Sequence, residues 1–154
     1  MTMEQFKAMV RGFCEDAGID DDGTPLLITV DDTPVKIGWL GDLDACRLQI
    51  DLGERPAANS RPGRPAFAEF LLALNLDDDR SDHGVFSLHP GSGHVILTLH
   101  IPMSAFDTGR RLLDVVMAQV PAALDAWSCA LDDHLLCDSG PPRAADPITA
   151  NQCV

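Results

Sequence analysis

The sequence contains no tyrosine, and aromatic residues make up only 5% of it. It also lacks any C-x-x-C pair, because its five cysteines stand singly along the chain. An odd number of isolated cysteines favours reduced thiols over a disulfide framework. These cysteines are Cys14, Cys46, Cys129, Cys137 and Cys153.

Positive charge is scarce, with 11 Lys and Arg against 24 Asp and Glu and a formal net charge of -13. Nucleic acids and anionic membrane surfaces attract clustered cations, so we expect neither as a partner. The sequence has no uninterrupted apolar run near the roughly 18 residues that a membrane span needs. Residues 1–4 lack the basic and apolar regions of a signal peptide. We therefore expect a cytosolic protein without membrane insertion.

The length and hydrophobic content suit one globular domain. With 154 residues, of which 45% are hydrophobic, the chain could bury about 70% of its unfolded surface. Residues 138–154 are rich in Gly, Pro and Ala, a composition typical of disorder. The sequence predicts a single domain over residues 1–137 and a disordered tail over residues 138–154.

The most informative segment is residues 83–101, whose pattern predicts a β-hairpin with two different faces. Strand-like runs flank Pro90-Gly91-Ser92-Gly93, and a four-residue turn would pair His89 with His94. One face is apolar and the other is mostly polar, so we expect a sheet with one face open to water or a partner. The apolar face carries Phe86, Leu88, Val95, Leu97, Leu99 and Ile101. The polar face carries His83, Val85, Ser87, His89, His94, Ile96, Thr98 and His100.

Apolar residues at helical spacing predict one helix near the N-terminus and another in the middle of the chain. The first begins with a capping box formed by Thr2 and Gln5 and ends at Gly18. The second has Pro65 in its first turn and extends to about Leu76.

A third, longer helix is predicted near the C-terminus. Ser104 with Asp107 offers its N-terminal cap, and the pattern extends to about Leu136. Pro121 should kink this helix because it removes a backbone donor in mid-span. The expected buried stripe is Leu113, Val116, Met117, Val120, Leu124, Trp127 and Leu131.

Three strand-like runs, at residues 26–30, 35–40 and 45–52, lie between the first two helices. The predicted order is therefore α-β-β-β-α-β-β-α, without an internal repeat. This order predicts an α+β fold in which an antiparallel sheet is covered by helices on one side. The second helix would then have an apolar stripe without a partner, which a second copy of the chain could cover. That stripe is Phe67, Phe70, Leu71 and Leu74.

With these elements in this order, the chain resembles the class I chaperones of bacterial type III secretion, the family that includes the chaperone of the translocated intimin receptor. The likeness covers residues 3–131 and is densest at residues 26–53, 67–76 and 83–107. It rests on the order of apolar patterns and turns along the chain and on no catalytic motif.

The resemblance implies a cytoplasmic bacterial homodimer without catalytic activity or a cofactor. It implies that the protein holds an extended N-terminal segment of a secreted effector and keeps it soluble and competent for export. Such a segment can add main-chain hydrogen bonds at a sheet edge and place alternate apolar side chains in grooves beside the first helix. The family analogy places effector contacts at Phe6, Val10, Leu26, Ile28, Val35, Ile37 and Trp39.

Each of these assignments has a simpler alternative. The seven contact residues could belong to the core, and Trp39 is the one we expect to be partly exposed, because interfaces favour large aromatic residues. The stripe on the second helix could be either a dimer interface or ordinary core.

Two other functions compete with the chaperone hypothesis. One is a regulatory or adaptor dimer of the same fold that binds a folded partner. The other is a small metal- or thiol-dependent hydrolase. His83 and His100 would lie side by side, but two imidazoles bind a metal weakly. Cys14 and Cys46 fall on apolar faces, where thiols are usually inert. We therefore expect no metal site, no cofactor and no catalytic residue.

Overall fold

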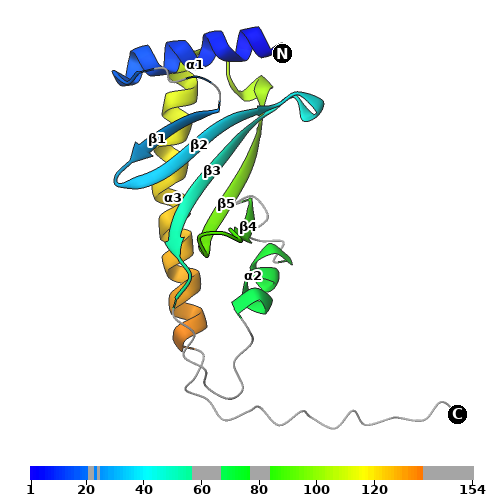
Figure 1. The fold of residues 1–154 in the computed structure, drawn as a ribbon, viewed down its shortest axis with the longest axis vertical. Helices are drawn as coiled ribbons and strands as arrows, with labels where there is room; N and C mark the ends of the chain where they lie inside the picture. The colour runs from blue at the N-terminus through cyan, green and yellow to red at the C-terminus, as the bar shows by residue number, and fades with distance from the viewer. Residues whose placement is uncertain (21–22, 24, 57–66, 77–83, 137–154) are drawn as a thin grey trace, which may run out of the picture.

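The computed structural model describes the chain except for residues 21, 22, 24, 57–66, 77–83 and 137–154 (Figure 1). Three helices and five strands occupy the described part, in the predicted order α-β-β-β-α-β-β-α. The helices are α1 (Met3–Ala17), α2 (Phe67–Leu76) and α3 (Gly109–Leu136). The strands are β1 (Leu26–Val30), β2 (Thr33–Leu40), β3 (Ala45–Glu54), β4 (Val85–Leu88) and β5 (His94–Pro102). The α+β class is confirmed, and the predicted tail lies outside the described residues.

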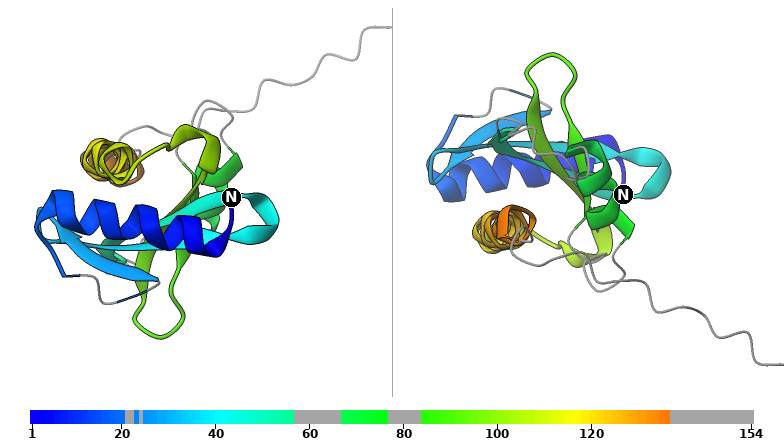
Figure 2. Two further views of the ribbon diagram at one scale, coloured as in Figure 1. Left: turned by 90° about the horizontal axis from the view of Figure 1, so that it is seen from above. Right: turned by 90° about the horizontal axis from the view of Figure 1, so that it is seen from below.

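All five strands form one antiparallel sheet in the order β1-β2-β3-β5-β4. Helix α1 lies across one end of the sheet, and α3 runs beside it along its length (Figure 1). Seen along the long axis, α3 is on one side of the sheet and the turn of the β4–β5 hairpin points to the other (Figure 2). Strands β1 and β4 are the two edges.

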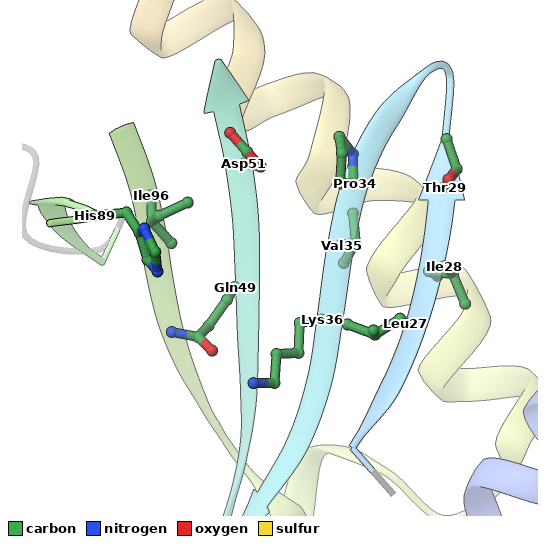
Figure 3. Close-up of a pocket in the computed structure, with 10 residues that line it drawn as sticks. All are labelled: Leu27, Ile28, Thr29, Pro34, Val35, Lys36, Gln49, Asp51, His89 and Ile96. Carbon is green, nitrogen blue, oxygen red and sulfur yellow. The ribbon is translucent and has the colours of Figure 1, made fainter. Parts of the chain in front are cut away.

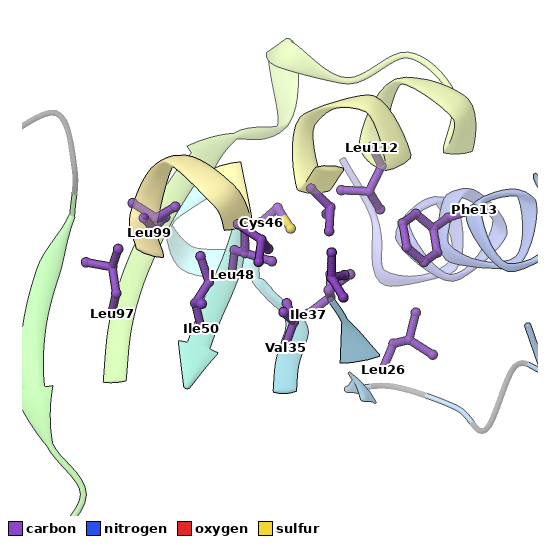
Figure 4. Packing of buried hydrophobic residues seen from close by; sticks show 14 of the residues in the cluster. Phe13, Leu26, Val35, Ile37, Cys46, Leu48, Ile50, Leu97, Leu99 and Leu112 are labelled. Carbon is purple, nitrogen blue, oxygen red and sulfur yellow. The ribbon is translucent and has the colours of Figure 1, made fainter. Parts of the chain in front are cut away.

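The core lies between the helices and the face of the sheet that we call the inner face. Alternate residues of β2, β3 and β5 point inward and are buried (Figure 4). Phe13 of α1 and Leu112 of α3 pack against them. The inward residues include Val35, Ile37, Cys46, Leu48, Ile50, Leu97 and Leu99. The residues between them form the outer face, which no helix covers within the described chain.

Helix α1 forms as its sequence predicts. The Thr2 hydroxyl accepts a hydrogen bond from the Gln5 N–H at 3.2 Å, and the Gln5 side chain accepts one from the Thr2 N–H at 2.8 Å. Gly18 ends the helix in the left-handed conformation, with φ at 68°, which glycine adopts without steric cost. Both predicted ends of α1 are confirmed.

The backbones of α1 and α3 are in direct contact where the helices cross. A side-chain carbon placed on Gly109 would lie only 2.7 Å from the carbonyl oxygen of Met9 and would also overlap the backbone of Gly12 and Phe13. A carbon placed on Gly12 would instead meet its nearest neighbour at an ordinary 3.8 Å. The crossing therefore requires glycine on α3 and tolerates a larger residue on α1.

The start of α3 differs from the prediction. Ser104 belongs to a single 3-10 turn, Met103–Ala105, and α3 begins at Gly109. The Thr108 hydroxyl accepts a hydrogen bond from the Arg111 N–H at 3.2 Å and thus serves as the N-terminal cap. The expectation that Ser104 caps the helix was wrong because the backbone leaves this turn in an extended conformation at Phe106, with φ at -120°, before α3 begins.

The buried face of α3 is rotated relative to the predicted stripe. Its buried residues are Leu112, Val116, Val120, Ala123, Trp127 and Ala130. Leu113, Leu124 and Leu131 are only half-buried, and Met117 is 48% exposed. The helix is continuous through Pro121. By length and composition alone, Gly109–Asp132 would also suffice to cross a membrane, although in this fold the same segment supplies one side of the core.

The hairpin register is confirmed. The His89 N–H donates to the carbonyl oxygen of His94 at 2.8 Å, so this pair closes the four-residue turn. Phe86 lies opposite Leu97, as the predicted apolar face requires. Strand β4 ends at Leu88, one residue earlier than predicted. His83 lies outside the described residues.

Candidate interaction site at the sheet edge

The two edges of the sheet differ in how their backbone groups are used. At β4, the side-chain amide of Asn75 on α2 donates to the Phe86 carbonyl oxygen at 2.8 Å and accepts from the Phe86 N–H at 2.8 Å. This side chain occupies the position that an additional strand would take. The edge at β4 is therefore closed by α2.

The edge at β1 is open within the described part of the chain. Strand β1 pairs only with β2 there, through a two-residue turn of Asp31 and Asp32. Val30 and Thr33 flank this turn as the first ladder pair. Because backbone bonding alternates along an antiparallel pair, Leu27 and Thr29 direct their N–H and C=O groups away from β2. These groups can accept an added strand.

A groove of about 630 Å³ lies on the inner-face side of this edge, between β1, the end of α1 and the first half of α3. Its walls are mainly apolar, and three of its large hydrophobic residues are exposed: Ile19 by 39%, Met117 by 48% and Leu27 by 69%. We call this the helix-side groove. The full lining is Phe13, Ala17, Ile19, Asp20, Leu27, Ile28, Thr29, Val30, Asp31, Leu113, Val116 and Met117.

A second groove, of about 540 Å³, lies over the outer face of the sheet (Figure 3). Lys36, Gln49, Asp51 and His89 line it together with apolar residues, so it carries charge of both signs. Asp51 also contacts the Nδ1 atom of His94 at 2.9 Å. We call this the outer groove. Its other lining residues are Leu27, Ile28, Thr29, Pro34, Val35 and Ile96.

Strand β1 forms a wall of both grooves, because Leu27, Ile28 and Thr29 line each of them. Successive side chains of a strand point to opposite faces of its sheet. A strand added beside β1 would therefore direct alternate side chains into the helix-side groove and the others toward the outer groove.

The overall architecture is shared with a solved structure. The fold is similar to that of a chain in the crystal structure of the ExsC–ExsE complex, with a TM-score of 0.57 and 18% identity over 88% of this chain and 96% of that chain. The chain has a type III secretion chaperone-like fold. No protein-family model and no curated protein sequence matches it.

In this chaperone-like fold, most of the predicted effector contacts are buried. Phe6, Val10, Leu26, Val35 and Ile37 belong to the core. Phe6 and Val10 are on the buried side of α1, and the strand residues Leu26, Val35 and Ile37 point to the inner face of the sheet, so almost none of their surface is exposed. Their burial agrees with the simpler alternative of core residues, and effector contacts at these five positions stay a prediction.

The other two predicted contacts are half-buried. Ile28 lines both grooves and so keeps a place in the candidate site. Trp39 stacks on Phe6 with ring centroids 6.5 Å apart. Its indole Nε1 is buried and has no hydrogen-bond partner among the described residues. Trp39 lines neither groove.

Sequence reasoning missed three exposed apolar residues at the β1 edge. Leu27 is the one apolar residue of β1 on the outer face, and at the open edge it lines both grooves. Its position out of phase with Leu26 and Ile28 was the available signal. Met117 was assigned to the buried stripe of α3 although it lies at its margin. Ile19 follows Gly18, and only the folded chain brings it beside β1.

The apolar stripe of α2 has a partner within the chain. Phe67 and Phe70 approach the ring of Trp127 on α3 with centroids 6.3 and 6.1 Å away, and Phe86 of β4 lies 5.7 Å from the same ring. Leu71 is buried and Leu74 is half-buried. The stripe therefore packs against the core of its own chain, and a dimer interface at these residues stays a prediction. The exposed side of α2 instead carries Leu72 and Leu76, which are 61% and 80% exposed.

The thiols of the described residues do not form a reactive site. Cys14 and Cys46 are buried, and burial raises the pKa of the Cys46 thiol to about 12, so it stays protonated and weakly nucleophilic. Cys129 is exposed. No three His, Cys, Asp or Glu side chains are grouped to hold a metal ion in the described parts of the chain. The predicted pair of His83 and His100 involves a residue outside those parts.

Proposed function

We propose that this protein is a cytoplasmic bacterial chaperone that binds an extended segment of a secreted effector along β1. It keeps that segment soluble and competent for type III secretion, and it needs no cofactor and performs no catalysis. The observation that carries the proposal is the open β1 edge with a groove on each side, where Ile19, Leu27 and Met117 expose apolar surface.

The geometry suits an unfolded segment better than a folded partner. An extended chain satisfies its own backbone groups by pairing with Leu27 and Thr29, and it gains further by burying alternate side chains in the helix-side groove. Burial of apolar area contributes about 25 cal/mol per Å² before the cost of ordering the segment. The type III chaperone-like fold supports the same function, and the similar structure is itself described as a complex of two proteins.

We also propose that the protein is a homodimer, in which a second copy covers the exposed side of α2. Leu72 and Leu76 are large apolar residues that no described part of the chain covers, and exposed apolar surface of this kind is typical of an interface. They lie on the side of α2 opposite the Trp127 contacts, so a symmetric pairing of two α2 helices would bury them without disturbing the core.

The decisive experiment is co-expression with the product of the adjacent gene, followed by binding measurements with edge variants. Thr29→Pro removes an outward N–H and should weaken binding of an extended client segment at least tenfold. Thr29→Val keeps that N–H and is the matched control. Both variants must keep the melting temperature of the wild type.

Other outcomes of this experiment would contradict the proposal. If Thr29→Pro binds as well as the wild type while substitution of Lys36 or Gln49 weakens binding, the partner docks on the outer face. Such a result would favour the adaptor function with a folded partner. Recovery of a folded client, resistant to protease, would favour it as well.

A further inference from the structure

The helix-side groove combines an apolar floor with charge of one sign. Among the residues that the structure describes, the charged ones that line it are Asp20, which follows α1, and Asp31, which begins the β1–β2 turn. Both side chains are exposed, and neither carboxylate has an ion-pair partner in that part of the chain. No described Lys, Arg or His lines this groove.

We propose that the segment bound at β1 carries Lys or Arg next to its apolar residues, and that these cations pair with Asp20 and Asp31. This inference rests on the proposed function and adds the chemistry of the client. An all-apolar segment would fill the floor of the groove but leave both carboxylates without partners. An acidic segment would place like charges together in a chain whose net charge is already -13.

The positions of the two aspartates define where the cations should occur. Asp31 lies directly beyond the last residue of β1, so a cation that pairs with it extends past the end of the added strand. Asp20 lies on the opposite wall, after the C-terminal end of α1. The recognised pattern is therefore a short run of alternating apolar residues with flanking positive charge.

Flanking charge would act mainly on selectivity. Exposed ion pairs contribute about 0.2–1 kcal/mol each, which corresponds to roughly a 1.4- to fivefold change in affinity per pair. They also accelerate encounter and weaken with salt. Burial of apolar side chains in the grooves provides the affinity for an extended segment. The two aspartates would repel acidic segments from the groove, including those of this protein itself.

The test uses three synthetic peptides with blocked ends and the same alternating Val-Ser centre, flanked by Lys, Gln or Glu at both ends. Binding to the full-length protein is measured by fluorescence anisotropy at low and high salt. We expect the Lys peptide to bind about twofold to thirtyfold more tightly than the Gln peptide, and the Glu peptide to bind most weakly. High salt should remove most of this order.

Paired variants assign the effect to the groove. In Asp20→Asn with Asp31→Asn, the three peptides should bind with nearly equal affinity, and Asn tolerates the left-handed φ of 47° at Asp31. Asp42→Asn with Asp125→Asn removes the same charge from exposed positions outside the groove and should preserve the order of the peptides. Equal loss of that order in both double variants would show that net charge alone is responsible, and would overturn the inference.

Failure of the inference differs from failure of the proposed function. If all three peptides bind the wild type equally and Met117→Asp weakens the binding of each, the groove binds extended segments regardless of their charge. This outcome contradicts the inference but supports the proposed function. If none of the peptides binds, or Met117→Asp changes nothing, both the groove and the charge pattern are contradicted.

Discussion

The side-chain amide of Asn75 brackets the backbone of Phe86, with both hydrogen bonds 2.8 Å long. One short helix thus closes one edge of the sheet and leaves the other edge as the place where a strand can be added. The contrast between β4 and β1 is central to the proposed function, because a sheet with two open edges would also be prone to self-association.

Asn75→Ala should destabilise the protein by about 1–3 kcal/mol, because it leaves the Phe86 N–H and C=O without partners. It should also promote aggregation through the uncovered β4 edge. Chemical denaturation and light scattering measure the two effects. Ser87→Ala, which removes an exposed hydroxyl bonded to the Ile96 carbonyl oxygen at 3.2 Å, is the control and should change stability by less than about 0.5 kcal/mol.

Gly109→Ala should cost about 1–3 kcal/mol or more, because the added carbon overlaps the backbone of α1 and forces the two helices apart. Gly12→Ala adds the same methyl group to the facing helix, where its nearest contact is 3.8 Å away. That variant should be neutral or more stable by up to about 1 kcal/mol, since alanine favours the helix. Equal effects of the two substitutions in thermal unfolding would contradict the described crossing.

The raised pKa of the buried Cys46 thiol should make the stability of the protein depend on pH. Its folded pKa of about 12 lies above the ordinary value of 9.0, so between these values the unfolded chain releases a proton that the folded chain retains. The free energy of unfolding should therefore fall as pH rises from about 9 to about 12, by at most about 1.4 kcal/mol per pH unit from this group. Below pH 9 this contribution is constant.

Comparison with Cys46→Ala isolates that contribution. The variant should be less stable at neutral pH but lose less stability than the wild type between pH 9 and 12. A thiol assay gives a second measure: with Cys129, Cys137 and Cys153 replaced by Ser, no thiol should react in the native protein and two should react in denaturant. Rapid labelling of the native protein would show that Cys46 is accessible.

Substitutions on the two sides of α2 should have different effects. Leu72→Glu and Leu76→Glu place charges on its exposed side and should convert a dimer of about 33 kDa into a folded monomer of 16.6 kDa. Phe70→Glu should unfold or aggregate the protein, because the Phe70 ring packs 6.1 Å from Trp127. If the wild type is a monomer by light scattering at micromolar concentration, the proposed homodimer is contradicted.

Much of the fold could be predicted because its signals are local. The capping box of Thr2 and Gln5, the turn at Gly18 and the four-residue turn that pairs His89 with His94 each depend on residues close together in sequence. The same signals located the strands to within a few residues. They required no knowledge of how the layers pack.

The errors concern which residues face outward, which depends on packing between distant segments. The buried face of α3 includes the small residues Ala123 and Ala130, and the larger Leu124 and Leu131 lie at its margin. Phe6 and Ile37 are buried for a related reason, since one is on α1 and the other is on the inner face against which the helices pack. Leu27 emerged as a site residue only when the sheet order showed that β1 is an edge.

Hydrogen exchange at the edge strands tests the central claim most directly. In the free protein, the amides of Leu27 and Thr29 should exchange rapidly, whereas the Phe86 amide should already be protected by Asn75. Addition of the client segment should slow exchange at Leu27 and Thr29 and leave Phe86 unchanged. If a bound client instead protects only outer-face positions of β3 and β5 and leaves Leu27 and Thr29 exchanging freely, strand addition at β1 is contradicted.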